Sequence, residues 1–322
     1  MRRVLVTHLD SSVGRRLVKA LYHDPDVSLV LGVGTGPPPS FLDPYRDKCF
    51  YERIDLAKAR HLNSFVRSER FLRARCDSVI HLPFTNEIER EHIPGNVPTL
   101  VSETRRLLAE CRKREEIERF VYLSTAFVYQ AEPGNGNLVG EDTLLGFDVE
   151  GAPAVRAWID ADLICQGELK DPELKMTILR CASIVGEGGQ FQMSPPLEDS
   201  RPALGFDPLL SVVADRDVAR ALQLALHGDE PGIYNVAGRE VFPRSELRPP
   251  VSRLGPLPVP RAVSGAVSLL RGIWSGGESV FDRYGIVLDT RHAQEVLGFE
   301  PQYRVEVRGR GSGRRIETVR CR

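Results

Sequence analysis

The chain has 322 residues, 42% of them hydrophobic and 27% charged, and a formal net charge of −1 at pH 7. This length and apolar content suit one enzyme-sized globular unit, and the near-zero charge excludes a basic face of the kind that binds nucleic acid. No apolar run approaches the roughly 18–20 residues of a membrane span, and the opening MRRVLVTH predicts a strand with no apolar leader, so we expect a cytoplasmic protein.

The predicted elements alternate along the first half of the chain. A strand over Arg3–Thr7 is followed by a short polar loop and a helix that begins near Ser11. Further β-rich runs, with helical stretches between them, cover Val27–Val33, Ser78–Leu82, Arg119–Thr125 and Met176–Cys181. This alternation predicts an α/β fold with a doubly wound parallel sheet and helices on both faces.

The regular alternation fades after Gly186, where Pro and Gly become frequent. We therefore predict a main domain over 1–185, to which 208–238 returns, and a smaller lobe over 186–306. The segment 307–322 is rich in Arg and Gly without apolar periodicity, and we expect it to lack stable structure.

Cysteine and histidine spacings indicate no metal site. The six cysteines are scattered without CxxC spacing, as expected of reduced thiols, and the seven histidines form no pair at ligand spacing. His81 lies inside the apolar run VIHL and is predicted to be a core histidine rather than a base. Asp217 in ADRDVARAL is predicted to cap a helix.

Several short motifs occur in an order that carries a resemblance. They are VLVT…G, IDL, VIHL, FVYLSTAFVY, ILRCASIVG, VVADRDVARAL, GIYNVAG and LGFEPQY. Over residues 3–306 the chain resembles the extended short-chain dehydrogenase/reductases of the NAD-dependent epimerase/dehydratase family. LGFDP, LPVPRAVSGAVSLLR and FDRYGIVLDT are most similar to an atypical bacterial branch that is UDP-glucose 4-epimerase-like. The resemblance implies a Rossmann-like domain for NAD or NADP and a carboxyl-terminal lobe for a nucleotide-linked sugar.

The resemblance also implies a catalytic tyrosine, with a lysine four residues later that lowers its pKa. In this chain Trp158 and Asp162 stand at those positions, and no tyrosine or lysine lies between Tyr129 and Lys170. Indole has no titratable proton in range, and a carboxylate would raise a neighbouring phenol's pKa. The family's acid/base pair is therefore predicted to be absent.

Three residues near that helix remain candidates. Thr125 stands where the family keeps a hydroxyl that orients the substrate, and a capping or packing role explains it equally well. Tyr129 offers a phenol, although no lysine is available to lower its pKa. The resemblance places Arg180 at the domain junction, close to the substrate.

The resemblance assigns the cofactor's phosphates to the turn THLDSSVG, which contains Thr7. His8, Ser11 and Gly14 stand at the family's three glycines. Gly14 keeps the close packing of helix on strand, and the Ser11 hydroxyl can donate to a phosphate oxygen. His8 requires either a strained backbone or a distorted turn.

At the other cofactor positions, two of the family's polar residues are replaced, and most of the positions that still match the family are apolar. Gly34 replaces the family's ribose-binding Asp, and Leu100 replaces an Asn. The matches that remain are the adenine-contacting pair Asp55 and Leu56, and the loop below the nicotinamide ribose, Leu82, Pro83 and Phe84. These changes predict a weakened site for NAD or NADP, if either binds.

Two hypotheses of different class follow. The first is a pseudoenzyme that binds a nucleotide or nucleotide sugar with an eroded active site. The second is an atypical NAD(P)-dependent nucleotide-sugar epimerase or oxidoreductase that uses other residues. In both, the partner is a small molecule, and the resemblance implies a possible homodimer through the helix that carries Trp158.

Overall fold

A seven-stranded parallel sheet forms the centre of the computed structural model, which describes residues 1–83, 98–132, 138–147, 153–194, 207–247, 284–309 and 315–321. The strand order is β10-β6-β5-β4-β1-β2-β3. The strands are β1 (Arg2–Val6), β2 (Val27–Gly34), β3 (Cys49–Arg53), β4 (Ser78–His81), β5 (Arg119–Thr125), β6 (Lys175–Cys181) and β10 (Gly232–Val236). The order reverses between β1 and β4, and ligands of such sheets bind at the carboxyl ends of the strands there.

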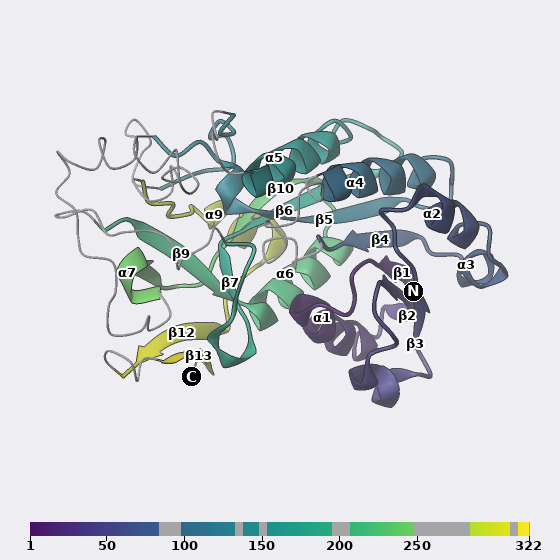
Figure 1. Cartoon of the computed structure of the whole chain (residues 1–322), viewed down its shortest axis with the longest axis horizontal. Coiled ribbons are helices and arrows are strands. Elements are labelled where there is room, and N and C mark those ends of the chain that lie inside the picture. The colour runs from purple at the N-terminus through teal and green to yellow at the C-terminus, as the bar shows by residue number, and fades with distance from the viewer. Residues whose placement is uncertain are drawn as a thin grey trace, which may run out of the picture.

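Helices cover both faces of this sheet. The helices α4 (Pro98–Cys111) and α5 (Pro153–Gln166) lie together on one face, and α1 (Ser12–Tyr22) and α6 (Asp215–His227) lie together on the other (Figure 1). Helix α1 buries Val13, Leu17, Val18 and Leu21, spaced as one face of an α-helix requires. The predicted doubly wound fold is confirmed.

The helical stretch predicted between the β-rich runs Val27–Val33 and Ser78–Leu82, over His61–Arg73, is two short helices, α2 (Ala59–Phe65) and α3 (Glu69–Ala74). The break is at Ser68, whose hydroxyl accepts a hydrogen bond from Phe71 N at 3.2 Å and caps α3.

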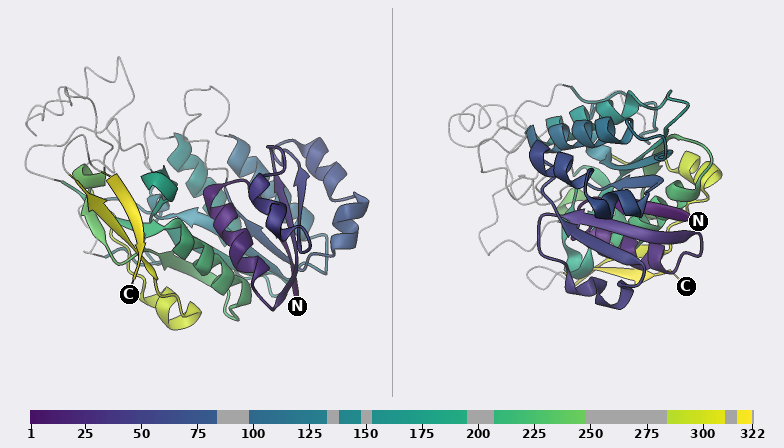
Figure 2. Two further views of the ribbon diagram at one scale, coloured as in Figure 1. Left: turned by 90° about the horizontal axis from the view of Figure 1, so that it is seen from below. Right: turned by 90° about the vertical axis from the view of Figure 1, so that its right-hand side faces the viewer.

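A smaller lobe adjoins the carboxyl ends of the strands (Figure 2). It contains a four-stranded sheet of β11 (Val241–Pro243), β9 (Leu209–Ala214), β7 (Ser183–Val185) and β8 (Phe191–Gln192). Two short helices are also described, α7 (Arg244–Leu247) and α9 (Arg291–Leu297). The segment 208–238 is divided, because β9 pairs in the smaller sheet whereas β10 joins the edge of the main one.

The expectation that 307–322 lacks structure is wrong for the described part of that segment. Strand β13 (Arg315–Arg320) pairs antiparallel with β12 (Tyr303–Arg308) over six residue pairs. The Arg-rich composition concealed the β-branched residues Ile316, Thr318 and Val319 of this strand.

Asp217 does not cap α6: it lies in the first turn, and its carboxylate accepts Gln302 N and Tyr303 N, both at 2.9 Å.

Within the described ranges, no helix is long and apolar enough to cross a membrane. In the same ranges, no three His, Cys, Asp or Glu side chains gather where they could hold a metal ion. Five cysteines are buried thiols, and Cys321 is partly exposed.

Candidate functional site

The turn between β1 and α1 keeps a tight shape although His8 replaces a glycine. His8 has φ 45°, in the left-handed region that costs a non-glycine residue roughly 1–2 kcal/mol. Ser11 N donates to His8 O at 3.0 Å, and Leu9 N donates to Val33 O at 3.1 Å. Of the two outcomes expected for His8, the structure has the strained backbone.

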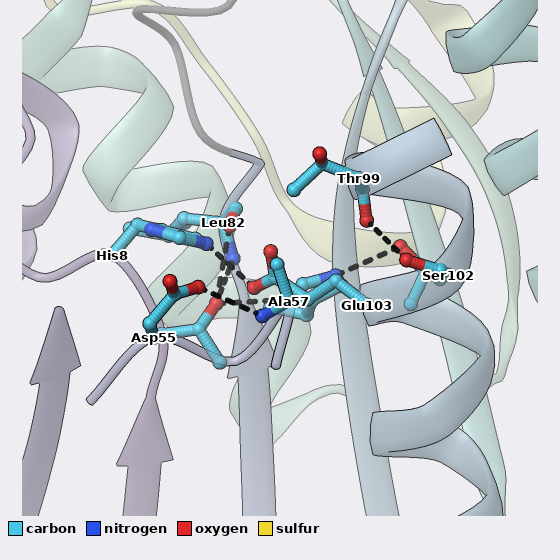
Figure 3. A network of polar contacts seen from close by, with 10 residues as sticks. His8, Asp55, Ala57, Leu82, Thr99, Ser102 and Glu103 are labelled. Atoms are coloured by element: carbon cyan, nitrogen blue, oxygen red, sulfur yellow. Dashed lines mark hydrogen bonds and ion pairs between the residues drawn. The ribbon is translucent and has the colours of Figure 1, made fainter. Parts of the chain in front are cut away.

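A buried ion pair accompanies this strained residue. His8 Nε2 lies 2.6 Å from Glu103 Oε1 of α4, and the side chains are 5% and 3% exposed (Figure 3). Burial opposes ionisation of Glu103, but the charge of His8 and its hydrogen bond hold the pKa of Glu103 below its ordinary value. The His8 side chain thus binds α4 inside the protein and is turned away from solvent.

A second polar network lies directly beside this pair. Thr7 Oγ1 is 2.8 Å from His81 Nδ1 and also accepts Leu82 N at 2.9 Å, while His81 Nε2 is 3.0 Å from Thr104 Oγ1. Burial lowers the pKa of His81 to about 4, so the imidazole is neutral at pH 7. His81 is therefore a core histidine with both ring nitrogens satisfied, as predicted.

The amino end of α1 combines a cap and a close approach. Ser11 Oγ accepts Gly14 N at 3.0 Å, and a Cβ on Gly14 would lie 2.4 Å from Leu9 O. Only glycine fits there, which agrees with the packing role expected for Gly14. Asp215 at the start of α6 accepts from Ser12 Oγ at 3.0 Å and from Arg16 Nε at 3.1 Å.

The carboxylate of Asp10, a residue of the β1–α1 turn that was not among the predicted site residues, lies beside Gly34 at the end of β2. A Cβ on Gly34 would lie 2.6 Å from Asp10 Oδ1 and 2.6 Å from the Tyr51 hydroxyl. Asp10 Oδ2 also accepts Gly36 N at 3.4 Å. The sequence signal that could have indicated this residue is an acidic side chain inside the turn THLDSSVG, where the family has glycines.

The other predicted cofactor residues make local contacts. Asp55 Oδ1 accepts Ala57 N at 3.2 Å (Figure 3). The other carboxylate oxygen of Asp55 is 3.1 Å from Lys58 Nζ. The apolar positions described there are all buried: Leu56, Leu82, Pro83 and Leu100. Phe84 lies outside the described residues.

Thr125 is fully buried at the end of β5, and its hydroxyl is engaged. Thr125 Oγ1 donates to Met193 O at 3.0 Å and accepts Phe127 N at 3.3 Å, which caps the 3-10 turn Ala126–Val128. Met193, like His8, has a positive φ, of 51°. These contacts are those of the capping alternative.

Trp158 and Asp162 lie on the buried face of α5. Asp162 is 0% exposed and pairs with Arg180, whose Nη2 is 2.7 Å from Oδ1 and whose Nε is 3.1 Å from Oδ2. Ser124 Oγ donates to Oδ2 at 2.5 Å, and Gln166 Nε2 to Oδ1 at 2.7 Å. The carboxylate at position 162 is thus matched by a cation and two donors inside the protein.

Arg180 also connects this cluster to Tyr129. The guanidinium carbon lies 4.7 Å from the centre of the Tyr129 ring, and Tyr129 Oη donates to Asn235 Oδ1 at 2.6 Å. Burial raises the pKa of Tyr129, so this phenol keeps its proton at neutral pH. The resemblance predicts that Arg180 lies close to the substrate. In the structure its side chain is 2% exposed and is bound to Asp162.

A family model described as the NAD dependent epimerase/dehydratase family matches residues 4–198. No curated protein matches the sequence.

Solved structures of nucleotide-sugar enzymes share the fold. A dTDP-glucose 4,6-dehydratase from Streptomyces venezuelae, with NAD and TYD bound, is 19% identical with TM-score 0.66, and the match covers 93% of this chain and 92% of that one. The same enzyme from Bacillus anthracis, in complex with NAD, is 16% identical with TM-score 0.65 over 94% and 92%. A UDP-glucuronic acid 4-epimerase from Bacillus cereus, in complex with UDP-glucuronic acid and NAD, is 18% identical with TM-score 0.62 over 92% and 93%. At these identities the likeness establishes the Rossmann-like fold.

Proposed function

We propose, from the premise that this chain belongs to the NAD-dependent epimerase/dehydratase family, that it binds a nucleotide or nucleotide sugar without the tyrosine- and lysine-dependent chemistry of that family. Some solved structures of similar fold contain NAD together with UDP-glucuronic acid or UDP-glucose, which supports the ligand class. The absence of chemistry is argued from this chain's own residues.

The observation that carries the proposal is the buried cluster around Asp162. Acid/base work needs a group with a proton free to move to or from the substrate. Asp162 is bound to Arg180, Ser124 and Gln166, and the Thr125 hydroxyl is bound to Met193 O. Each polar group at these positions is therefore committed to the protein itself.

The residues of the turn fit the phosphates of a dinucleotide better than the sequence alone suggests. The left-handed φ of His8 preserves the tight turn, and its side chain is held in the interior by Glu103. Ser11 Oγ caps α1 as an acceptor, which leaves its own hydrogen available for a phosphate oxygen. When bound, a nicotinamide cofactor would supply hydride chemistry, and the amino end of α1 would hold its phosphates.

Thermal unfolding with candidate ligands tests the proposal. The panel contains NAD(H), NADP(H), UDP-glucose and dTDP-glucose, each also incubated with the protein and analysed for product. A ligand at 100 times its dissociation constant stabilises the folded state by about 2.7 kcal/mol, which gives a clear rise in Tm. We expect a rise with at least one ligand and no turnover of either sugar nucleotide.

Two outcomes would contradict the proposal separately. No shift with any member of the panel would remove the binding function. Turnover that is lost in Thr125→Ala and kept in Thr125→Ser, which retains the hydroxyl, would instead establish an enzyme that uses non-standard residues.

A further inference from the structure

The carboxylate of Asp10 lies where a side chain at the end of β2 would begin. Asp10 is half-buried in the β1–α1 turn, and a Cβ on Gly34 would meet both Asp10 Oδ1 and the Tyr51 hydroxyl at 2.6 Å. Gly36 N donates to Asp10 Oδ2 at 3.4 Å. With the Asp10 carboxylate and the Tyr51 hydroxyl in these positions, a side chain at position 34 is therefore excluded.

This exclusion concerns the place where dinucleotide-binding sheets recognise the adenosine ribose. In such sheets an acid at the end of the second strand accepts hydrogen bonds from the ribose hydroxyl groups. Here that strand ends in Gly34, while Asp10 brings a carboxylate to the same edge from the neighbouring turn. Building on the proposed binding function, we propose that Asp10 is the ribose-binding carboxylate of this chain and that it selects NAD(H) over NADP(H).

The polar groups around Asp10 favour binding of the ribose hydroxyl groups over binding of a 2′-phosphate. The Tyr51 hydroxyl donates to Gly36 O at 3.1 Å, and Arg53 Nε donates to Thr35 O at 3.0 Å. A carboxylate accepts two hydroxyl hydrogens, but it repels the 2′-phosphate of NADP(H). Arg53 is the nearby cation that would favour the opposite preference, so it must be tested as well.

Fluorescence titration with NADH and NADPH measures the preference directly. The principal variant is Asp10→Asn, because the amide oxygen still accepts from Gly36 N while the charge is removed. We expect wild-type protein to bind NADH more tightly, and Asp10→Asn to reduce the ratio of the two affinities about tenfold. Asp43→Asn, a loss of the same charge at an exposed position, is the matched control and should leave the ratio unchanged.

A transplant variant tests the position independently of the residue. Asp10→Ala removes the carboxylate, Gly34→Asp restores one at the usual place, and Tyr51→Phe removes the hydroxyl that would otherwise meet the new Cβ. We expect this triple variant to recover the NADH preference that Asp10→Ala alone loses. Thermal unfolding of each variant without ligand confirms that it folds.

The possible failures are distinguishable. Equal effects of Asp10→Asn on both affinities, or a wild-type preference for NADPH that Arg53→Gln abolishes, would overturn the assignment of Asp10 and leave the binding function intact. Binding of a sugar nucleotide with neither NADH nor NADPH would do the same. Only a protein that binds none of these ligands would overturn the proposed function itself.

Discussion

Replacing His8 by glycine would relieve backbone strain at this position and would also remove the buried ion pair with Glu103. Glycine adopts φ 45° without steric cost, which raises the free energy of unfolding by roughly 1–2 kcal/mol. The greater conformational freedom of glycine in the unfolded chain lowers it again by about 0.5–1 kcal/mol. The same change leaves Glu103, 2% exposed, without the partner at 2.6 Å. Breaking a buried pair from one side costs about 3–5 kcal/mol. We therefore expect His8→Gly to lower the free energy of unfolding by about 1.5–5 kcal/mol.

Urea unfolding at several pH values measures this difference. In the wild type the pKa of Glu103 is lowered, so its contribution is present above the ordinary carboxyl range and is lost as the pH falls below it. Without His8, burial favours the protonated acid, and stability falls as the pH rises instead. The difference in free energy of unfolding between the wild type and His8→Gly should therefore increase from pH 4 to pH 7.

A double variant isolates the pair from the backbone. His8→Gly with Glu103→Met removes the strain and replaces the buried charge by an apolar side chain of similar length. We expect it to lie within about 1–2 kcal/mol of the wild type. If His8→Gly alone were more stable than the wild type, the left-handed strain would exceed the value of the ion pair, and the reasoning would fail.

Three further changes test the core of the site. Asp162→Asn should lower the free energy of unfolding, measured with urea, by about 3–5 kcal/mol because Arg180 stays buried with its charge unmatched. The same change at the partly exposed Asp160, also on α5, should cost less than about 1 kcal/mol. Because the pKa of His81 is lowered to about 4, the unfolded chain binds a proton there first as the pH falls, so stability should decline between about pH 6.5 and 4, and His81→Gln should remove that part of the decline. Gly14→Ala should cost about 3 kcal/mol, seen as a lower Tm, because the new methyl meets the turn carbonyl at 2.4 Å.

The parallel sheet follows from local patterns, which is why it could be predicted. Apolar runs and amphipathic stretches alternate, and each pattern depends on residues close in the chain. The edge strand Cys49–Arg53 was missed because CFYER is short and half polar. The hairpin at the end of the chain was missed because its pairing partner, β12, decides its structure.

The site depends on contacts between distant residues, which no local pattern contains. His8 and Glu103 are 95 positions apart, and Thr125 and Met193 are 68 apart. Alignment to the family's motifs predicts Asp162 as a departure from the family's lysine, but it does not predict that Arg180 neutralises this carboxylate. It also predicts a loss at Gly34, because it compares single positions and does not detect that the Asp10 carboxylate lies beside Gly34.

The Asp162–Arg180 pair also constrains the history of this protein. A lysine gained at position 162 would face the buried guanidinium, and a change of Arg180 first would leave Asp162 unpaired in the core. Each single step passes through a protein that has lost a large share of the 5–15 kcal/mol by which typical domains are stable. Substitution at either position is thus tolerated only when the other changes as well. We expect related sequences to keep Asp162 and Arg180 together or to replace both.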